Sequence, residues 1–153
     1  MLDNVFGELE YDFLWEGKTS ITMFDKQYEI GIGINGEEED GIQQIQRESY
    51  TKFKNNETEI IKNVLDKVYE YYKYICEFEP EKIDPGVLDK LPKVSNYMDM
   101  MNLITPTRLC IPELDDDREI DILFDCVWDF ELGMGVKIIN EVVTKVGVQN
   151  DVL

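Results

Sequence analysis

The fold is decided by the stretch Ile120-Asp121-Ile122-Leu123-Phe124-Asp125-Cys126-Val127-Trp128-Asp129, which continues as Phe130-Glu131-Leu132-Gly133-Met134-Gly135. Side chains of a strand alternate between two faces, so this stretch would place apolar residues on one face and carboxylates between aliphatic residues on the other. The first face comprises Ile120, Ile122, Phe124, Cys126 and Trp128. The second comprises Asp121, Leu123, Asp125, Val127 and Asp129. We expect the first face to lie in the core and the second either to be solvated or to meet a basic surface.

Three more strand patterns occupy the N-terminal part of the chain. Residues 6–15 alternate, which predicts an inward face and an outward face. The inward residues are Leu9, Tyr11, Phe13 and Trp15, and the outward residues are Glu8, Glu10 and Asp12. Residues 19–24 and 27–34 follow, and the three segments together predict an antiparallel meander. Gly31 and Gly33 would lie opposite the isoleucines of the third strand, where the missing side chains permit a bulge or the close approach of another segment.

Two amphipathic helices are predicted between the strand regions. Acids from Glu37 to Asp40 suit the first turn of a helix, and Asp40 can cap it. One face of this helix comprises Ile42, Ile45, Ser49, Tyr50 and Phe53. A second helix is expected from Asn56, because Glu59 follows three residues later as in a capping box. Its apolar stripe comprises Ile60, Ile61, Val64, Leu65, Val68, Tyr72 and Ile75.

Residues 79–86 are expected to form a loop or short turns, residues 87–91 one helical turn, and residues 94–104 show no clear period. Residues 107–111 lie between Pro106 and Pro112 and are predicted to form an edge strand, because proline is poorly tolerated inside a sheet. Residues 136–139 and 142–148 complete a second meander around a turn at Asn140-Glu141. We therefore expect a single α+β domain over residues 1–153, with antiparallel β-meanders at both ends and two central helices packed on one face of the sheet.

The net charge is −18, and the excess of acids lies near the two ends of the sequence. Residues 1–40 contain eleven acids and two bases, residues 41–100 eleven and nine, and residues 101–153 eleven and four. Such a field repels nucleic acid and anionic membranes, and it accelerates association with a basic protein. The same charge also favours solubility, so alone it identifies no partner. No apolar run approaches the roughly 20 residues of a membrane span, and we expect a cytoplasmic protein.

Neither a cofactor nor a metal is indicated. Histidine is absent, which excludes the usual zinc sets and the Ser-His and Cys-His nucleophile pairs. Cys76, Cys110 and Cys126 are far apart in apolar surroundings, and we expect buried reduced thiols. The run Asp115-Asp116-Asp117 lacks the glycine and the distal glutamate of a calcium loop, and it is interpreted as a solvated turn.

Carboxylate catalysis is the remaining enzymatic hypothesis. Asp121, Asp125 and Asp129 share a predicted face, but neighbours would lie about 13 Å apart at the strand rise of about 3.3 Å per residue. Catalytic carboxylates of glycosidases are separated by roughly 5 to 9.5 Å. A pair drawn from different strands is left open. We expect a protein that is not an enzyme, with an unrecognised carboxylate-based enzyme as an alternative.

Segments near both ends resemble a family of small uncharacterised bacterial domains. The resemblance rests on residues 6–11 (Phe-Gly-Glu-Leu-Glu-Tyr), 15–17 (Trp-Glu-Gly), 123–129 (Leu-Phe-Asp-Cys-Val-Trp-Asp), 133–136 (Gly-Met-Gly-Val) and 147–150 (Gly-Val-Gln-Asn). These domains look like those encoded beside polymorphic and LXG-type secreted toxins, as cognate immunity proteins. The resemblance implies a cytosolic protein that binds a toxin and occludes its active site, with no activity of its own. It identifies neither the toxin nor any binding residue.

Charge and resemblance together predict a protein that binds and neutralises a cognate basic toxin domain, with a nuclease as one candidate. The alternative is a housekeeping or regulatory protein-binding module without a toxin partner. The predicted partner-binding surface comprises Glu8, Glu10, Asp12, Asp121, Leu123, Asp125, Val127 and Asp129. In this surface Leu123 and Val127 would form an apolar centre within a rim of exposed carboxylates.

Overall fold

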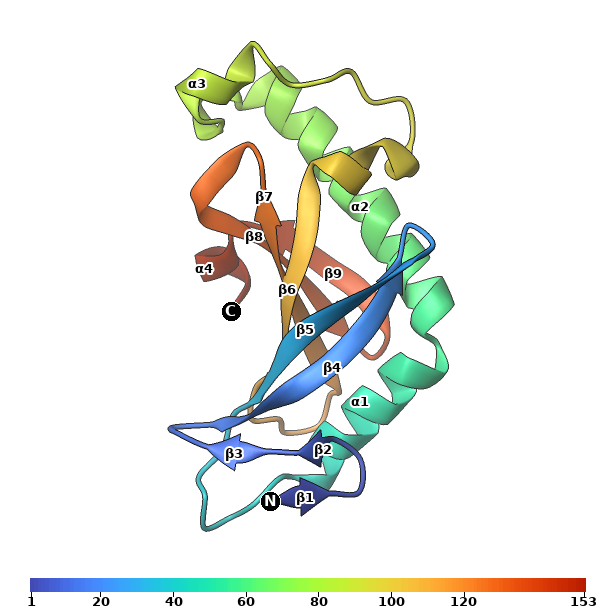
Figure 1. Cartoon of the computed structure of the whole chain (residues 1–153), viewed down its shortest axis with the longest axis vertical. Coiled ribbons are helices and arrows are strands. Elements are labelled where there is room, and N and C mark those ends of the chain that lie inside the picture. Colours follow the sequence, from blue (N-terminus) through green and yellow to red (C-terminus); the bar gives the residue numbers. More distant parts are fainter.

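Seven strands form one mixed sheet in the order β3-β4-β5-β6-β7-β8-β9 in the computed structural model, which describes residues 1–153 (Figure 1). The strands are β3 (Glu10–Tyr11), β4 (Trp15–Met23), β5 (Lys26–Ile34), β6 (Ile104–Ile111), β7 (Glu119–Cys126), β8 (Asp129–Ile139) and β9 (Val142–Gly147). A separate ribbon pairs β1 (Leu2–Asp3) with β2 (Gly7–Glu8). Strands thus lie at both ends of the chain with helices between them, which confirms the predicted α+β class.

β6 is the central strand of the sheet, and the prediction of an edge strand was wrong. It pairs in parallel with β5 over Arg108–Ile111 and antiparallel with β7. The parallel ladder does not extend to Pro106, and the β6–β7 register shifts between Pro106 and Arg108. The proline therefore lies where the ladder is already interrupted, so its missing N–H costs little. β6 joins the two antiparallel meanders into one sheet.

The predicted strand over residues 6–15 is divided into three pieces. β2 and β3 take up its first part, and β4 begins only at Trp15. Residues 12–14 form a bend in which Phe13 has φ +67°, a left-handed conformation that a bulky side chain rarely adopts. Phe13 therefore leaves the strand alternation. Its side chain is 90% exposed, so the prediction that it faces inward was wrong.

The hairpins of the two meanders are closed by two-residue turns. Phe24 and Asp25 both have positive φ between β4 and β5, as do Asn140 and Glu141 between β8 and β9. Such paired left-handed residues match the twist of the flanking strands. The second turn lies where the sequence predicts it, and the first begins one residue earlier than the gap at residues 25–26 between the predicted strands 19–24 and 27–34.

Helices α1 (Gln44–Asn55) and α2 (Glu57–Phe78) pack against the sheet, with their buried apolar residues in its main core. The first helix starts later than predicted, because Gln43 and not Asp40 is its N-cap and forms a capping box with Gln46. Asn56 precedes the second helix as predicted, although its side chain makes no cap hydrogen bond. Every residue of the predicted α2 stripe is buried. None of the helices is both long and apolar enough to cross a membrane.

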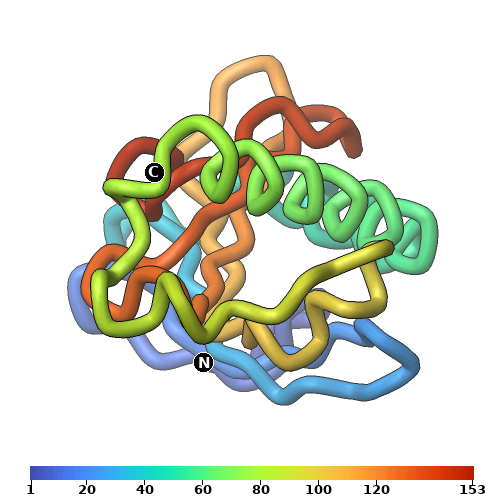
Figure 2. Tube along the Cα trace, turned by 90° about the horizontal axis from the view of Figure 1, so that it is seen from above, coloured from blue at the N-terminus to red at the C-terminus, as the bar shows by residue number.

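The segment between α2 and β6 contains short helical elements only. These are η1 (Pro80–Lys82), α3 (Pro85–Leu88) and η2 (Tyr97–Asn102). Figure 2 shows this yellow-green segment passing across the upper end of the molecule, with α2 on one side and the blue β4–β5 hairpin on the other. Ile83, Met100 and Leu103 anchor it in the core. On the other side of the sheet lies α4 (Gln149–Val152).

One cluster of 33 buried residues forms the core. Trp15 and Trp128 belong to it with exposed fractions of 7% and 2%, as expected from their place at the ends of apolar patterns. Cys126 is buried and Cys110 is half-buried, but Cys76 is exposed on α2, where the prediction of a buried thiol was wrong. All three thiols are free.

Candidate partner-binding surface

Phe13 is the most exposed of the large apolar side chains that stand out from the surface, at the bend between β3 and β4. A non-glycine residue in this conformation costs of order 1–3 kcal/mol and persists only where its surroundings fix it. The hydroxyl of Tyr11 donates to the carbonyl oxygens of Gly36 at 3.0 Å and of Phe13 at 3.4 Å. The Asp12 N–H also donates to the Leu14 carbonyl oxygen at 3.0 Å. These bonds therefore fix the backbone of the bend in the conformation that exposes the phenyl ring to water.

Tyr11 and Leu14, which flank Phe13, pack against the sheet, whereas Phe13 points into solvent. Tyr11 packs edge-on against Trp15, with ring centroids 4.9 Å apart. Leu14 lies over Gly33, where a Cβ atom would come within 2.7 Å of its Cδ1. The absence of a side chain at Gly33 thus permits the close approach that the sequence predicts, by Leu14 and by the guanidinium of Arg108.

Three loops gather acidic side chains at the end of the molecule that carries Phe13, and we call residues 12–14, 35–43 and 112–118 the acidic end (Figure 1). Its exposed carboxylates are Asp12, Glu37, Glu38, Glu39, Asp40, Glu113, Asp115, Asp116 and Asp117. Its one basic residue, Arg118, is engaged by both carboxylate oxygens of Glu141, at 2.9 and 2.8 Å. The acidic end therefore presents nine carboxylates and no free cation.

Neutral side chains hold these loops together. Gln46 is fully buried, and its amide donates to the carbonyl oxygens of Asn35 and Pro112, both at 2.8 Å. Gln43 accepts from the Leu114 N–H at 2.8 Å and donates to the Leu114 carbonyl oxygen at 2.9 Å. Because amides and not lysines join the loops, their carboxylates stay available to a cationic partner.

A shallow groove of about 500 Å³ lies beside this end, between the β2–β3 segment and β4. Glu8, Glu10 and Glu16 line it together with Lys18. Glu16 is paired with Arg108 at 3.0 Å, whereas Glu8 and Glu10 are exposed. The structure thus brings together two of the predicted surface residues, and the third, Asp12, lies in the adjoining bend.

The part of the predicted surface on β7 and its hairpin is mostly buried. Asp125 is exposed and Val127 is half-buried, but Asp121, Leu123 and Asp129 are 2%, 8% and 9% exposed. The prediction of exposure was wrong for these three, since β7 lies inside the sheet and α4 covers the neighbouring strand β8.

Asp129 has a local structural contact that explains its burial. Its Oδ1 accepts the N–H of Leu132 at 3.0 Å at the start of β8. β7 ends at Cys126, so Asp129 belongs to the next strand and does not continue the alternation that begins at Ile120. Its carboxylate fixes the hairpin end and is not directed to a partner.

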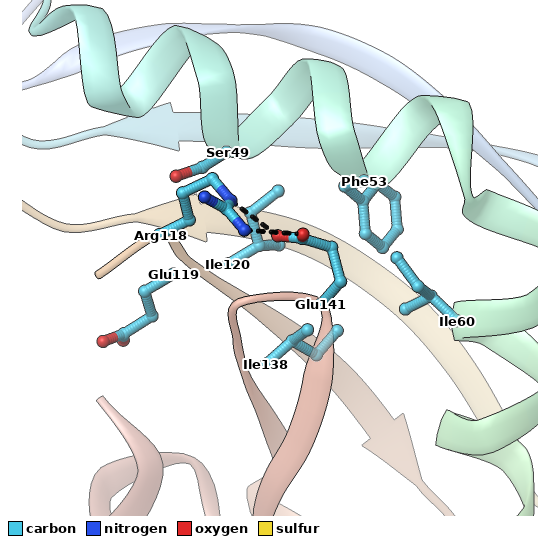
Figure 3. A pocket seen from close by; sticks show the side chains of 8 residues that line it. All are labelled: Ser49, Phe53, Ile60, Arg118, Glu119, Ile120, Ile138 and Glu141. Atoms are coloured by element: carbon cyan, nitrogen blue, oxygen red, sulfur yellow. Dashed lines mark hydrogen bonds and ion pairs between the residues drawn. The ribbon is translucent and has the colours of Figure 1, made fainter. Parts of the chain in front are cut away.

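A small, partly open space lies between the helices α1 and α2 and the strands β7 and β8 (Figure 3). Its volume is about 10 Å³, close to the minimum for one water molecule. Figure 3 shows the Arg118–Glu141 ion pair beside it, below Ser49 of α1 and near Phe53. This space is too small for an organic substrate. The structure also contains no group of three or more Cys, Asp or Glu side chains arranged to hold a metal ion.

A family model described as "Domain of unknown function (DUF6985)" matches residues 5–153. The chain belongs to the DUF6985 family. Comparison with curated proteins gave no match, and neither did comparison with solved structures. The match spans both meanders and the helices between them, so the fold described above is that of the DUF6985 domain in this chain.

Sequence patterns missed Phe13 and most of the acidic end. Phe13 fits the alternation of a strand, and no local signal separates it from Tyr11 and Trp15. The acidic runs at 37–40 and 115–117 predict a helix start and a turn, and neither pattern indicates a shared surface. Their meeting depends on the sheet order, which brings the ends of β5 and β6 side by side.

Proposed function

We propose that this DUF6985 protein is a non-catalytic immunity protein of the cytoplasm, which binds a basic bacterial toxin domain through its acidic end and blocks that domain's active site. One observation carries the proposal most: an exposed phenylalanine in a strained backbone lies at the end of the molecule where three loops present nine exposed carboxylates. Protein interfaces commonly combine a desolvated aromatic anchor with a charged rim. The toxin assignment rests on the resemblance described above.

The carboxylates and Phe13 would affect different rate constants of binding. Carboxylates of the acidic end attract a basic partner over several ångströms, which raises the association rate at low salt. Phe13 has no charge and would act after contact, by entering an apolar site on the partner, so it lowers the dissociation rate. Because its loop is already fixed by Tyr11, little conformational entropy would be lost on binding.

A basic surface on the partner also indicates which kind of toxin it is. A cleft rich in lysine and arginine is what nucleases use to hold phosphates, and an acidic protein lying in it would exclude nucleic acid. The proposal therefore predicts no binding of nucleic acid or anionic membrane by this chain, and no cofactor.

The test uses a secreted toxin domain encoded beside the gene, with kinetics measured across a salt series. Phe13→Ala should weaken binding by about 30-fold or more, the size of an interface hot spot of about 2 kcal/mol. Phe130→Ala is the matched control, because Phe130 is 70% exposed and is the second residue of β8. The β7–β8 turn lies at the end of the molecule opposite the α1-side loop of the acidic end (Figure 1). Reversing Glu37, Glu38 and Glu39 to lysine should lower the association rate at least tenfold at low salt, and less at high salt.

Cell survival distinguishes immunity from binding alone. Cells that express the toxin domain should survive with the wild-type chain and with Phe130→Ala, and die with the charge-reversed variant. Binding without protection would favour the alternative of a regulatory protein-binding module. Unchanged kinetics in both the Phe13→Ala and the charge-reversed chain would remove the acidic end as the interface.

A further inference from the structure

The two edges of the seven-stranded sheet differ in how their backbone groups are bonded. β3 pairs with only the first two residues of β4, so the rest of β4 forms one edge of the sheet. Side chains from the helices occupy this edge. Glu57 Oε2 accepts the Thr22 N–H at 2.8 Å. Lys54 Nζ donates to the Ser20 carbonyl oxygen at 2.7 Å. These contacts keep another strand from pairing with β4 there.

β9 forms the other edge, and its outer backbone groups have no partner within the chain. The sheet places β9 next to β8 alone. Outside this ladder, no hydrogen bond of the chain reaches the backbone N–H or carbonyl groups of residues 142–147, because the side-chain bonds of this strand start at the hydroxyl of Thr144 and the amine of Lys145. Such an open edge is a template for pairing with a further strand.

A groove of about 460 Å³ runs between this open edge and α2, which lies beside the red β8–β9 hairpin in Figure 2. Val143 and Val146 line it from β9, and Tyr71 and Tyr74 line it from α2. The β8–β9 register leaves Thr144 as an extra residue, so the two valines pack on the same side although they are three positions apart. Free strand backbone beside apolar side chains is the arrangement that binds an added strand.

Large apolar side chains stand exposed on both elements that border the groove. Tyr74 is 50% exposed and packs on Phe78, which is 62% exposed, with ring centroids 5.2 Å apart. On β9, Val142 is 62% exposed. Aromatic side chains are enriched in the cores of protein interfaces. α2 and β9 together therefore form one face, which we call the β9 face, with an open backbone edge and apolar side chains.

The β9 face is electrically neutral in a chain whose net charge is −18. Residues 60–78 of α2 contain three acids and three lysines, and residues 141–147 contain one acid and one lysine. Lys67 and Glu70 in the groove lie 3.5 Å apart and remain 54% and 63% exposed. A strongly basic or strongly acidic partner gains little from such a surface. A surface with the same mixed charges complements it, and a second copy of the chain carries one.

We propose that the chain forms a two-fold dimer in which β9 pairs antiparallel with β9 of a second copy, so that one sheet continues through both subunits. The register that fits the side chains places Val143 opposite Val146 of the second copy, and Thr144 opposite its Lys145. β-branched residues then face each other, and the two lysines do not. The α2 helices would lie side by side, where Lys67 and Glu70 can form pairs across the two-fold axis.

The dimer depends on salt in the opposite sense to the binding of a basic toxin. Each copy has a net charge of −18, so repulsion between two copies opposes dimer formation, and salt screens this repulsion. Dimer formation should therefore become stronger as salt is raised, whereas toxin binding should become weaker. The dimer uses none of the residues assigned to toxin binding, so either proposal can fail without the other.

Sedimentation velocity across a wide range of chain concentrations, at low and high salt, measures the dimer. Thr144→Lys should raise its dissociation constant at least about tenfold, because each copy then sets a lysine opposite Lys145 of the other. Thr144→Glu should lower the dissociation constant, although it makes the chain more acidic, because glutamate faces the same lysine. Thr22→Lys is the matched control: Thr22 is also an exposed strand threonine, but it lies on the blocked β4 edge, and the substitution should leave the dimer unchanged.

Amide hydrogen exchange of the wild-type chain tests the same interface without any substitution. As the chain concentration rises, amides of residues 142–147 should gain protection, and amides of β4 should not. A chain that stays monomeric at every concentration and salt overturns the proposal. A dimer that Thr144→Lys leaves unchanged, or that forms without added protection in β9, overturns it as well. Weaker dimers in both the lysine and the glutamate variant would overturn the pairing of Thr144 with Lys145.

Discussion

Replacing Asp3 by asparagine tests how the N-terminal ribbon is held on α1. The Asp3 side chain is 5% exposed, and its Oδ2 accepts from Arg47 Nη2 at 2.6 Å. Its Oδ1 accepts the backbone N–H groups of Val5 at 2.8 Å and Phe6 at 3.1 Å. Asparagine keeps an oxygen for these two donors, but its amide NH2 would face Arg47, so the substitution removes both the charge and the hydrogen bond of the ion pair.

The expected loss follows from the burial of the two partners. Breaking a buried ion pair costs about 3–5 kcal/mol, because the remaining charge is left without compensation. Arg47 keeps a 28% exposed side chain and a bond from Nη1 to the Ile42 carbonyl oxygen, so water can relieve part of the penalty. We expect Asp3→Asn to lower the free energy of unfolding by about 3 kcal/mol, the low end of that range.

The pH dependence gives an independent readout. Burial opposes ionisation of Asp3, but the hydrogen bond and charge of Arg47 and the two backbone donors together hold the pKa of Asp3 below its ordinary value of 3.8. A lowered pKa adds stability above the ordinary value, and this contribution disappears as the pH falls through the folded-state value. The difference between wild type and Asp3→Asn should therefore be full at pH 7 and shrink at strongly acidic pH.

Urea unfolding at a series of pH values measures both effects. Asp25→Asn, at an exposed turn, is the control and should change stability by less than about 0.5 kcal/mol. A double-mutant cycle with Arg47→Ala should give a coupling energy of at least about 2 kcal/mol between Asp3 and Arg47. A loss below 0.5 kcal/mol at pH 7, or a loss that is the same at all pH values, would refute the ion-pair argument.

Other substitutions test the core, the sheet and the thiols. Trp128→Ala should lower the free energy of unfolding by about 3–5 kcal/mol, because a 2% exposed indole leaves a cavity; a loss under 1 kcal/mol in thermal or urea unfolding would place Trp128 outside the core. Gly33→Ala should cost about 1–3 kcal/mol, since its Cβ would come within 2.4 Å of a guanidinium nitrogen, whereas Gly86→Ala, with no atom within 4 Å, should be neutral. A thiol reagent should modify exposed Cys76 in the native state and Cys126 only on unfolding, as peptide mass mapping would show; equal rates would contradict the burial difference.

The periodicity of apolar residues predicts most of the secondary structure without any knowledge of tertiary contacts. The stripe from Ile60 to Ile75 has helical spacing, and all its residues are buried on α2. The alternation from Ile120 to Cys126 likewise becomes the core face of β7. These patterns are local, because the same few consecutive residues determine both the type of element and the face that it buries.

Because the patterns are local, they predict the exposed residues of β2 and β3 correctly but not those of β7. Acidic outward positions on β2 and β3 stay exposed because these strands lie at the edge of the fold, so Glu8 and Glu10 were correctly placed. Asp121 has the same local pattern, yet it is buried because β7 lies inside the sheet and α4 covers its neighbour. Alternation separates the two faces of a strand but does not tell whether the second face is covered.

The sequence by itself determined the α+β class, the α2 stripe, the place of the β8–β9 turn and the burial of both tryptophans. Only the tertiary structure decided that β6 is central, that Phe13 leaves its strand, and that three acidic loops meet at one end. The first group depends on residues within a few positions of one another. The second depends on the parallel pairing of β5 with β6, whose residues lie more than 70 positions apart, and such pairing is chosen by the packing energy of the whole core.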